Sequence, residues 1–125
     1  METISIQQTG STPQVLFDPL TSTLCLLGES YPENSFDFYT PVVSWLKSAL
    51  QELSVLTLDI TITYMNSSST KCILDLLDIM EEAYSRGVAT SIIWRYDREN
   101  PRSYVLAEEF LEEVTFPFEI EVLTK

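Results

Sequence analysis

The regular alternation of strand-like and helix-like segments constrains this chain more than any other feature of its sequence. Strand-like apolar runs recur with helical segments between them, at residues 22–28, 55–63, 88–95 and 115–123. The intervening segments carry apolar residues at helical spacing, over residues 41–53, 72–86 and 103–113. A repeated strand–helix–strand order favours right-handed crossovers, which make consecutive strands parallel. The pattern therefore predicts an α/β fold.

The N-terminal part of the chain does not follow this alternation. Residues 3–8 and 14–17 have the pattern of short strands, and turn-forming residues follow each of them, over 9–13 and 18–22. We therefore expect a single domain over residues 1–125. Its sheet is mixed and largely parallel, with about three α-helices and an N-terminal antiparallel addition.

The start of the first long helix has two alternatives. Asn34 or Ser35 suits an N-cap, with Asp37 in the first turn. The pair Thr40–Pro41 is a second start signal, because proline is favoured at the first helical position after a threonine cap. Either a short turn over 35–39 leads into a helix at 41–53, or the whole segment forms one kinked helix.

The central strand and the helix that follows it have distinct inward faces. Alternation directs four strand side chains to one side, namely Leu56, Leu58, Ile60 and Ile62. Helical spacing directs five side chains inward, namely Ile73, Leu76, Leu77, Met80 and Ala83. Gly87 is expected to end this helix, and Pro117 indicates that the last strand lies at a sheet edge. Four acidic residues fall on the solvated helix face rather than in a metal site: Asp75, Asp78, Glu81 and Glu82.

The charge of the chain excludes several classes of function. The formal net charge is −12, and the chain contains no histidine. Nucleic acids and anionic membranes are bound by basic surfaces, so neither is expected as a partner. Histidine is the commonest general base and metal ligand, so its absence argues against an enzyme and against a metal site. No cofactor is expected either.

Hydropathy and cysteine content indicate where the protein works. No apolar run approaches the ~18 residues of a membrane helix, and the N-terminus has no basic stretch followed by an apolar one. The two cysteines, Cys25 and Cys72, both lie in apolar segments, where buried thiols are more common than a disulfide. We therefore expect a cytoplasmic protein.

The most informative stretch for function is Asn66-Ser-Ser-Ser-Thr70, an asparagine followed by hydroxyl residues, where a strand passes into a helix. Oxygen side chains are common at this position because they accept hydrogen bonds from the free N–H groups of the first turn. The same position suits a phosphate, since the helix N-terminus carries a partial positive charge. Capping alone and a phosphorylation switch are therefore both open.

Three loops are expected side by side, because strand-to-helix loops of a parallel sheet emerge at the carboxyl ends of the strands. They span residues 28–34, 66–70 and 96–102. Four basic residues fall near this edge, namely Lys71, Arg95, Arg98 and Arg102. Lys71 or Arg98 would be able to pair with a phosphate among the serines, unless these side chains only make solvated pairs with neighbouring acids.

Several motifs along the chain resemble one family. They are Gly28-Glu-Ser-Tyr-Pro-Glu-Asn-Ser35, Tyr64-Met-Asn-Ser-Ser-Ser69, Tyr96-Asp-Arg-Glu-Asn100, Glu108-Glu109-Phe110 and Phe116-Pro-Phe118. Together they resemble the SiaC family of bacterial regulatory phosphoproteins. The resemblance implies a fold similar to the STAS-like domains of anti-sigma-factor antagonists, in agreement with the predicted α/β order.

The function implied by this resemblance is partner switching. A cognate protein kinase phosphorylates the hydroxyl residue after the asparagine, and a PP2C-type phosphatase removes the phosphate. The unmodified form binds and activates a diguanylate cyclase, which raises cyclic di-GMP and promotes biofilm formation. Carried over to this sequence, the acceptor is Ser67, with Ser68 as second choice. The residues expected to contact partners are Glu29, Tyr31, Pro32, Glu33, Asn34, Asn66, Ser68, Ser69, Lys71, Asp97 and Arg98.

Three other interpretations remain open. The chain could serve an anti-sigma-factor-antagonist-type switch with another effector, since one fold supports several outputs. It could be a scaffold in which the serines only cap the helix. It could also be a small acidic enzyme that uses Glu29, Glu33 or Asp97 for acid–base chemistry.

Overall fold

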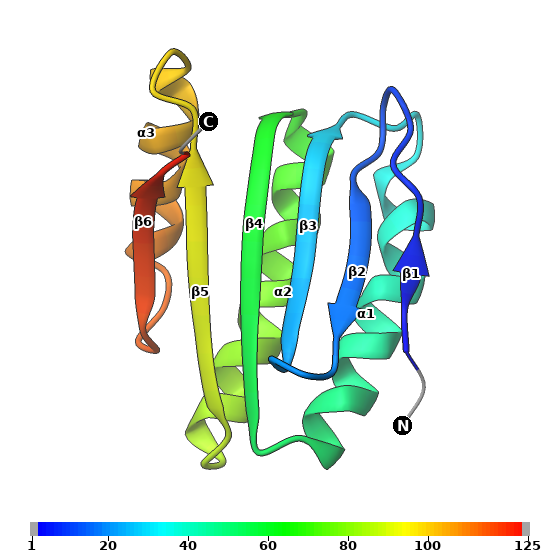
Figure 1. The fold of residues 1–125 in the computed structure, drawn as a ribbon, viewed down its shortest axis with the longest axis vertical. Helices are drawn as coiled ribbons and strands as arrows, with labels where there is room; N and C mark the ends of the chain where they lie inside the picture. The colour runs from blue at the N-terminus through cyan, green and yellow to red at the C-terminus, as the bar shows by residue number, and fades with distance from the viewer. Residues whose placement is uncertain (1–2, 124–125) are drawn as a thin grey trace.

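The computed structural model describes residues 3–123 and contains one sheet with three helices (Figure 1). The strands are β1 (Ser5–Ile6), β2 (Gln14–Asp18), β3 (Thr23–Ser30), β4 (Val55–Met65), β5 (Ala89–Tyr96) and β6 (Phe118–Val122). The helices are α1 (Ser35–Glu52), α2 (Ser67–Ser85) and α3 (Pro101–Leu111). Residues 1–2, which belong to the stretch searched for a signal peptide, lie outside the described part.

The six strands follow one another across the sheet in sequence order, from β1 to β6. β1 pairs with β2, and β2 with β3, in antiparallel fashion, whereas all later neighbours are parallel. The predicted mixed sheet with an N-terminal antiparallel addition is therefore confirmed. Because the strand order never reverses, crossovers of one hand place all three helices on the same face (Figure 1).

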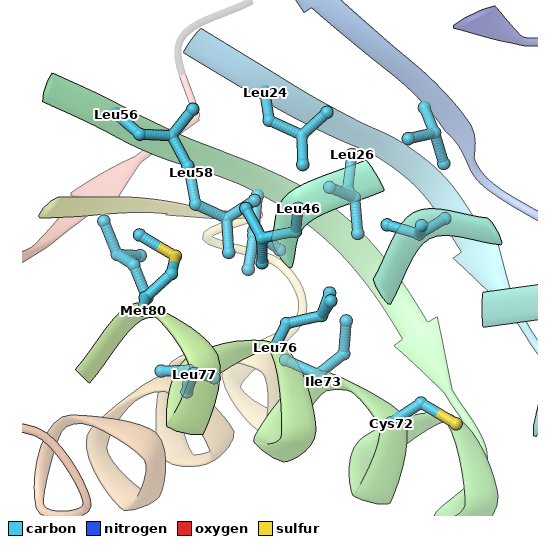
Figure 2. Packing of buried hydrophobic residues seen from close by; sticks show 14 of the residues in the cluster. Leu24, Leu26, Leu46, Leu56, Leu58, Cys72, Ile73, Leu76, Leu77 and Met80 are labelled. Carbon is cyan, nitrogen blue, oxygen red and sulfur yellow. The ribbon is translucent and has the colours of Figure 1, made fainter. Parts of the chain in front are cut away.

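The core lies between this helical layer and the sheet. Figure 2 shows α2 side chains directed toward leucines of β3 and β4. All nine inward positions predicted for β4 and α2 are buried, with at most 2 % exposure, namely Leu56, Leu58, Ile60, Ile62, Ile73, Leu76, Leu77, Met80 and Ala83. Burial of each large apolar side chain contributes about 1.5–3 kcal/mol, so this layer is the main source of stability.

Several element bounds differ from the prediction. β1 has only two residues, and β3 continues to Ser30, so that the loop expected from residue 28 begins after Ser30. Gly28 makes this extension possible, because it adopts a φ of 128° at a register shift against β4. The extension carries Ser30 into the protein interior, where it is fully buried.

The first helix is continuous from Ser35 to Glu52, with Pro41 inside it. Asn34 is the N-cap, and its side-chain Oδ1 accepts a 3.1 Å hydrogen bond from the Asp37 N–H. The alternative in which the helix starts at Thr40–Pro41 is therefore wrong. Pro41 lies on the exposed side of α1, and the Thr40 hydroxyl donates to the Phe36 carbonyl at 2.6 Å. Tertiary packing of α1 outweighs the cost of an internal proline.

The C-terminal end of α2 matches the expectation for Gly87. The Gly87 N–H donates to the Tyr84 carbonyl and the Val88 N–H to the Ala83 carbonyl, which is the Schellman arrangement. Gly87 has a φ of 104°. Glu81 of α2 was expected on the solvated face but is half-buried. Its carboxylate accepts hydrogen bonds from the backbone N–H and the hydroxyl of Thr115.

The sheet face opposite the helices carries ion pairs. Arg95, the next-to-last residue of β5, contacts Asp59 at 3.2 Å and Glu121 at 3.0 Å, so its charge is already paired on the sheet. Cys25 is only half-buried, in contrast to Cys72. Burial and the nearby Asp59 carboxylate raise the pKa of the Cys25 thiol. Among residues 3–123, none of the helices combines the length and apolar character needed to cross a membrane.

Candidate functional site

Asn66 is the residue that caps α2. Its side-chain oxygen accepts a 2.9 Å hydrogen bond from the Ser69 N–H, and its own N–H donates to the Ser30 carbonyl at 3.0 Å. Such a cap stabilises a helix by about 1 kcal/mol. Ser67 is therefore the first helical residue, and the capping role that was one alternative for the serines belongs to Asn66.

The three serines that begin α2 differ in accessibility. Ser67 is exposed, and among residues 3–123 no group is hydrogen-bonded to its hydroxyl. Ser68 is half-buried, and its hydroxyl contacts Ser35 Oγ at 2.8 Å and Asn66 Oδ1 at 3.2 Å. Ser69 is fully buried. An enzyme that modifies a hydroxyl from outside therefore reaches Ser67 without disturbing the fold.

A chain of buried hydroxyl groups lies directly beneath these serines. Ser30 Oγ lies 2.7 Å from Tyr39 Oη and donates to Ser69 Oγ at 2.8 Å. Ser69 Oγ is 3.1 Å from Ser35 Oγ, which in turn contacts Ser68. The hydroxyls connect the end of β3 with the first turns of α1 and α2. Ser69 thus belongs to this internal network, and its expected role as a partner contact is wrong.

Burial of the Tyr39 hydroxyl gives the protein a pH-dependent stability at alkaline pH. Burial raises the pKa of Tyr39 from 10.0 to about 12, so the folded state holds this proton more tightly than the unfolded state. The resulting stability is present below pH ~10 and is lost as the pH rises through ~12, at about 1.4 kcal/mol per pH unit. We expect Tyr39→Phe to lack this component. Urea denaturation of both proteins at pH 9 and pH 11 measures it, and parallel losses of stability in the two proteins would contradict the assignment.

The first two predicted loops lie next to each other at the carboxyl edge of β3 and β4. Tyr31 and Tyr64 are both exposed, and their rings contact each other edge to face, with centroids 5.6 Å apart. The other residues expected to contact partners in the first loop, Glu29, Pro32, Glu33 and Asn34, are exposed or half-buried. The prediction that these two loops are adjacent is confirmed by the strand register, which pairs Ser30 with Met65.

The third loop is joined to the same edge through the start of α3. The pairing of β4 with β5 ends at Ile60 and Trp94, so the last residues of β4 have no strand on that side. Asn100 replaces the missing strand, because its side-chain amide donates to the Thr63 carbonyl at 2.5 Å. A longer contact of 3.5 Å joins the Ser103 hydroxyl to the next inward carbonyl, that of Ile62.

A cavity of about 560 Å³ occupies the space between the start of α2 and the exposed side of α3. Its floor is the end of β4, from Ile62 to Met65. The polar side chains around it include Asn66, Ser67, Thr70, Asn100, Arg102 and Glu109. The exposed Ser67 hydroxyl therefore lies at a recess rather than on a flat surface.

The basic residues at this edge are placed differently from the prediction. Lys71 and Arg98 are exposed but do not line the cavity, whereas Arg102 does. Asp97 is half-buried, and its carboxylate accepts a hydrogen bond from the Glu99 N–H at 2.9 Å. The hydroxyls of Ser30, Ser35 and Tyr39 were not foreseen, because no local pattern shows which side chains of separate elements meet.

Comparison with known proteins places the chain in a family. A family model described as the SiaC family regulatory phosphoproteins matches residues 6–123. The chain belongs to the SiaC family. It is therefore a regulatory phosphoprotein by family. An uncharacterized protein of Pseudomonas aeruginosa strain UCBPP-PA14 is 41 % identical over 122 residues, which are 97 % of each chain.

Solved structures of the family have the same fold. SiaC of Pseudomonas aeruginosa is 40 % identical, with a TM-score of 0.91 over 98 % of this chain and all of that one. A second structure is that of the diguanylate cyclase SiaD in complex with its activator SiaC, from the same organism. The similarity covers 96 % of this chain and 99 % of the matched chain, with 40 % identity and a TM-score of 0.91.

Proposed function

We propose that this SiaC-family protein is a partner switch that is phosphorylated on Ser67 and, when unmodified, binds and activates a diguanylate cyclase. The cyclase assignment is supported by the 40 % identical SiaC that forms a complex with the cyclase SiaD as its activator. The observation that carries the acceptor assignment is the contrast among the serines. Ser67 is exposed with a free hydroxyl, Ser68 is held by Ser35 and Asn66, and Ser69 is buried.

The chemistry of the switch is a reversible phosphoryl transfer. A cognate serine/threonine kinase transfers the γ-phosphoryl group of ATP to the Ser67 oxygen, which loses its proton, and ADP leaves. A PP2C-type phosphatase uses water to release inorganic phosphate and restore the hydroxyl. These partners are encountered in the cytoplasm, and the chain takes part as substrate and regulator rather than as the catalyst.

The contact surface for the effector lies around Ser67 and includes the exposed pair Tyr31 and Tyr64. Exposed tyrosines supply large contact areas at low entropic cost, and they are enriched at protein interfaces. The phosphoryl group adds about −1.5 to −2 charges. Glu29 and Glu33 are exposed carboxylates on β3 and the loop after it, and the added charge at the same sheet edge resists burial against a partner. Phosphorylation therefore separates the regulator from the effector.

The decisive test is reconstitution with the diguanylate cyclase of the same host. We expect unmodified protein to co-purify with the cyclase and to increase its production of cyclic di-GMP. Protein that is stoichiometrically phosphorylated, as confirmed by intact-mass spectrometry, is expected to do neither. Treatment of the same sample with a PP2C-type phosphatase serves as the control and restores both properties. Equal stimulation by the modified and unmodified forms would refute the switch.

A further inference from the structure

The cavity beside Ser67 contains a cation without a partner. Arg102, from the first turn of α3, lines the same cavity as the Ser67 hydroxyl of α2. Within residues 3–123 Arg102 forms no ion pair, whereas Arg86 and Arg95 are both paired with carboxylates. Arg98 likewise forms no ion pair among these residues, but it does not line the cavity. Arg102 is available to bind an anion that appears in the cavity.

We propose that the cavity between α2 and α3 is an internal binding site for the phosphate on Ser67, with Arg102 as its ligand. The guanidinium presents a planar set of donors that matches phosphate oxygens and forms short charge-assisted hydrogen bonds with them. A water occupies roughly 30 Å³ in the liquid, so about 560 Å³ accommodates a phosphoryl group together with hydrating water. This inference rests on the proposed function, since only modification of Ser67 places a phosphate there.

The location of the cavity makes such a contact a bridge between the starts of two helices. α3 is attached to the sheet through hydrogen bonds from Asn100 to Thr63 and from Ser103 to Ile62, and through the contact of Phe110 with Trp94. The phosphate joins the first turn of α2 to the first turn of α3 across the end of β4. The modified protein therefore has a phosphate in the cavity that links α3 to α2, whereas the unmodified protein has an open cavity beside an exposed hydroxyl.

One other charged side chain of the cavity opposes this contact. The titratable groups that line the cavity are Tyr64 of β4 and Arg102 and Glu109 of α3. The carboxylate of Glu109 repels a dianionic phosphate, whereas Arg102 attracts it. The two α3 residues are therefore expected to have opposite effects on the phosphate, and this contrast distinguishes a specific site from a general effect of surface charge.

The test uses full-length protein with phosphoserine installed at residue 67 by genetic code expansion, so that it does not depend on any kinase. The second pKa of the phosphate, about 6 for free phosphoserine, is followed by ³¹P NMR. We expect this pKa to lie below about 6 in the otherwise unchanged protein. In Arg102→Gln the pKa is expected to rise by about 1 unit, and in Arg102→Lys by less, because lysine keeps the charge but not the planar set of donors. Glu109→Gln is expected to lower the value.

Arg98→Gln is the matched control, because Arg98 is also exposed and lies outside the cavity, and the substitution removes the same charge. This control is expected to change the phosphate pKa by no more than about 0.2 units, the size of a screened surface interaction. Equal effects of the Arg98 and Arg102 variants, or no effect of either, overturn the internal site. If the kinase phosphorylates another residue, the proposed acceptor is refuted. The NMR experiment still tests whether the cavity binds a phosphate on residue 67, because the phosphoserine is installed without a kinase.

Discussion

Ser67→Ala is expected to abolish the incorporation of phosphate by the cognate kinase, whereas Ser68→Ala retains it. The reason is accessibility, since the Ser67 hydroxyl is exposed and the Ser68 hydroxyl is engaged with Ser35 and Asn66. Both substitutions lie at a helix start, and that of Ser67 is expected to change the stability by less than about 0.5 kcal/mol. Intact-mass spectrometry after incubation with kinase and ATP measures the stoichiometry. Full phosphorylation of the Ser67→Ala protein would show that the acceptor lies elsewhere.

The companion substitution Ser67→Asp is expected to weaken binding to the cyclase. A carboxylate supplies one negative charge where phosphoserine supplies nearly two, so the effect is smaller than that of true phosphorylation. We expect a loss of affinity of about 5- to 150-fold, the usual range for coupling between a modification and a binding site. Ser67→Asn has a similar size without the charge and is the control. If both variants bind equally weakly, steric obstruction rather than charge separates the partners.

Trp94→Ala is expected to produce the largest loss of stability among the changes considered. Trp94 is fully buried, its ring lies 5.2 Å from that of Phe110, and its Nε1 donates to the Ser103 hydroxyl at 3.2 Å. Removing so large a buried side chain costs about 3–5 kcal/mol. Because both contacts belong to α3, the substitution also loosens the helix that carries Arg102.

The size of this effect is measured by urea denaturation followed by circular dichroism, since Trp94 is itself one of the two tryptophans that fluoresce. Ser103→Ala is the matched variant, because it removes the hydrogen bond but leaves the ring contact. It is expected to cost about 1 kcal/mol, the net value of one hydrogen bond. A Trp94→Ala protein within about 1 kcal/mol of the parent would mean that α3 contributes little to the core.

The predicted elements agree with the structure where a local pattern carries the information. The inward faces of β4 and α2 were recognised because apolar side chains recur every second residue or every third to fourth residue. The end of α2 at Gly87 and the edge position of the last strand were recognised from glycine and proline. Element bounds were less certain: α1 runs through Pro41, because its contacts with the core outweigh the local start signal at Thr40.

The candidate site was predictable only in part. The position of Asn66 and the serines at a helix start follows from the residue types, and the strand order brings Tyr31 and Tyr64 together. Which serine is free was not predictable, because it depends on the hydroxyls that Ser35 and Ser30 bring from other elements. The same holds for the basic residue at the cavity, where Arg102 stands and the sequence had favoured Lys71 or Arg98.

The chain alone therefore determined the α/β order, the buried faces and the family motif around Ser67, since each depends on residues close together in sequence. The tertiary structure alone decided which hydroxyl is exposed, which cation lines the same cavity, and that this cavity lies between α2 and α3. These properties arise where β4 continues beyond its pairing with β5. There the side chain of Asn100, at the start of α3, donates a hydrogen bond to the Thr63 carbonyl of β4. These properties depend on contacts between residues about 35 or more positions apart in sequence. Local periodicity does not predict such contacts, because it reflects only near neighbours in the chain.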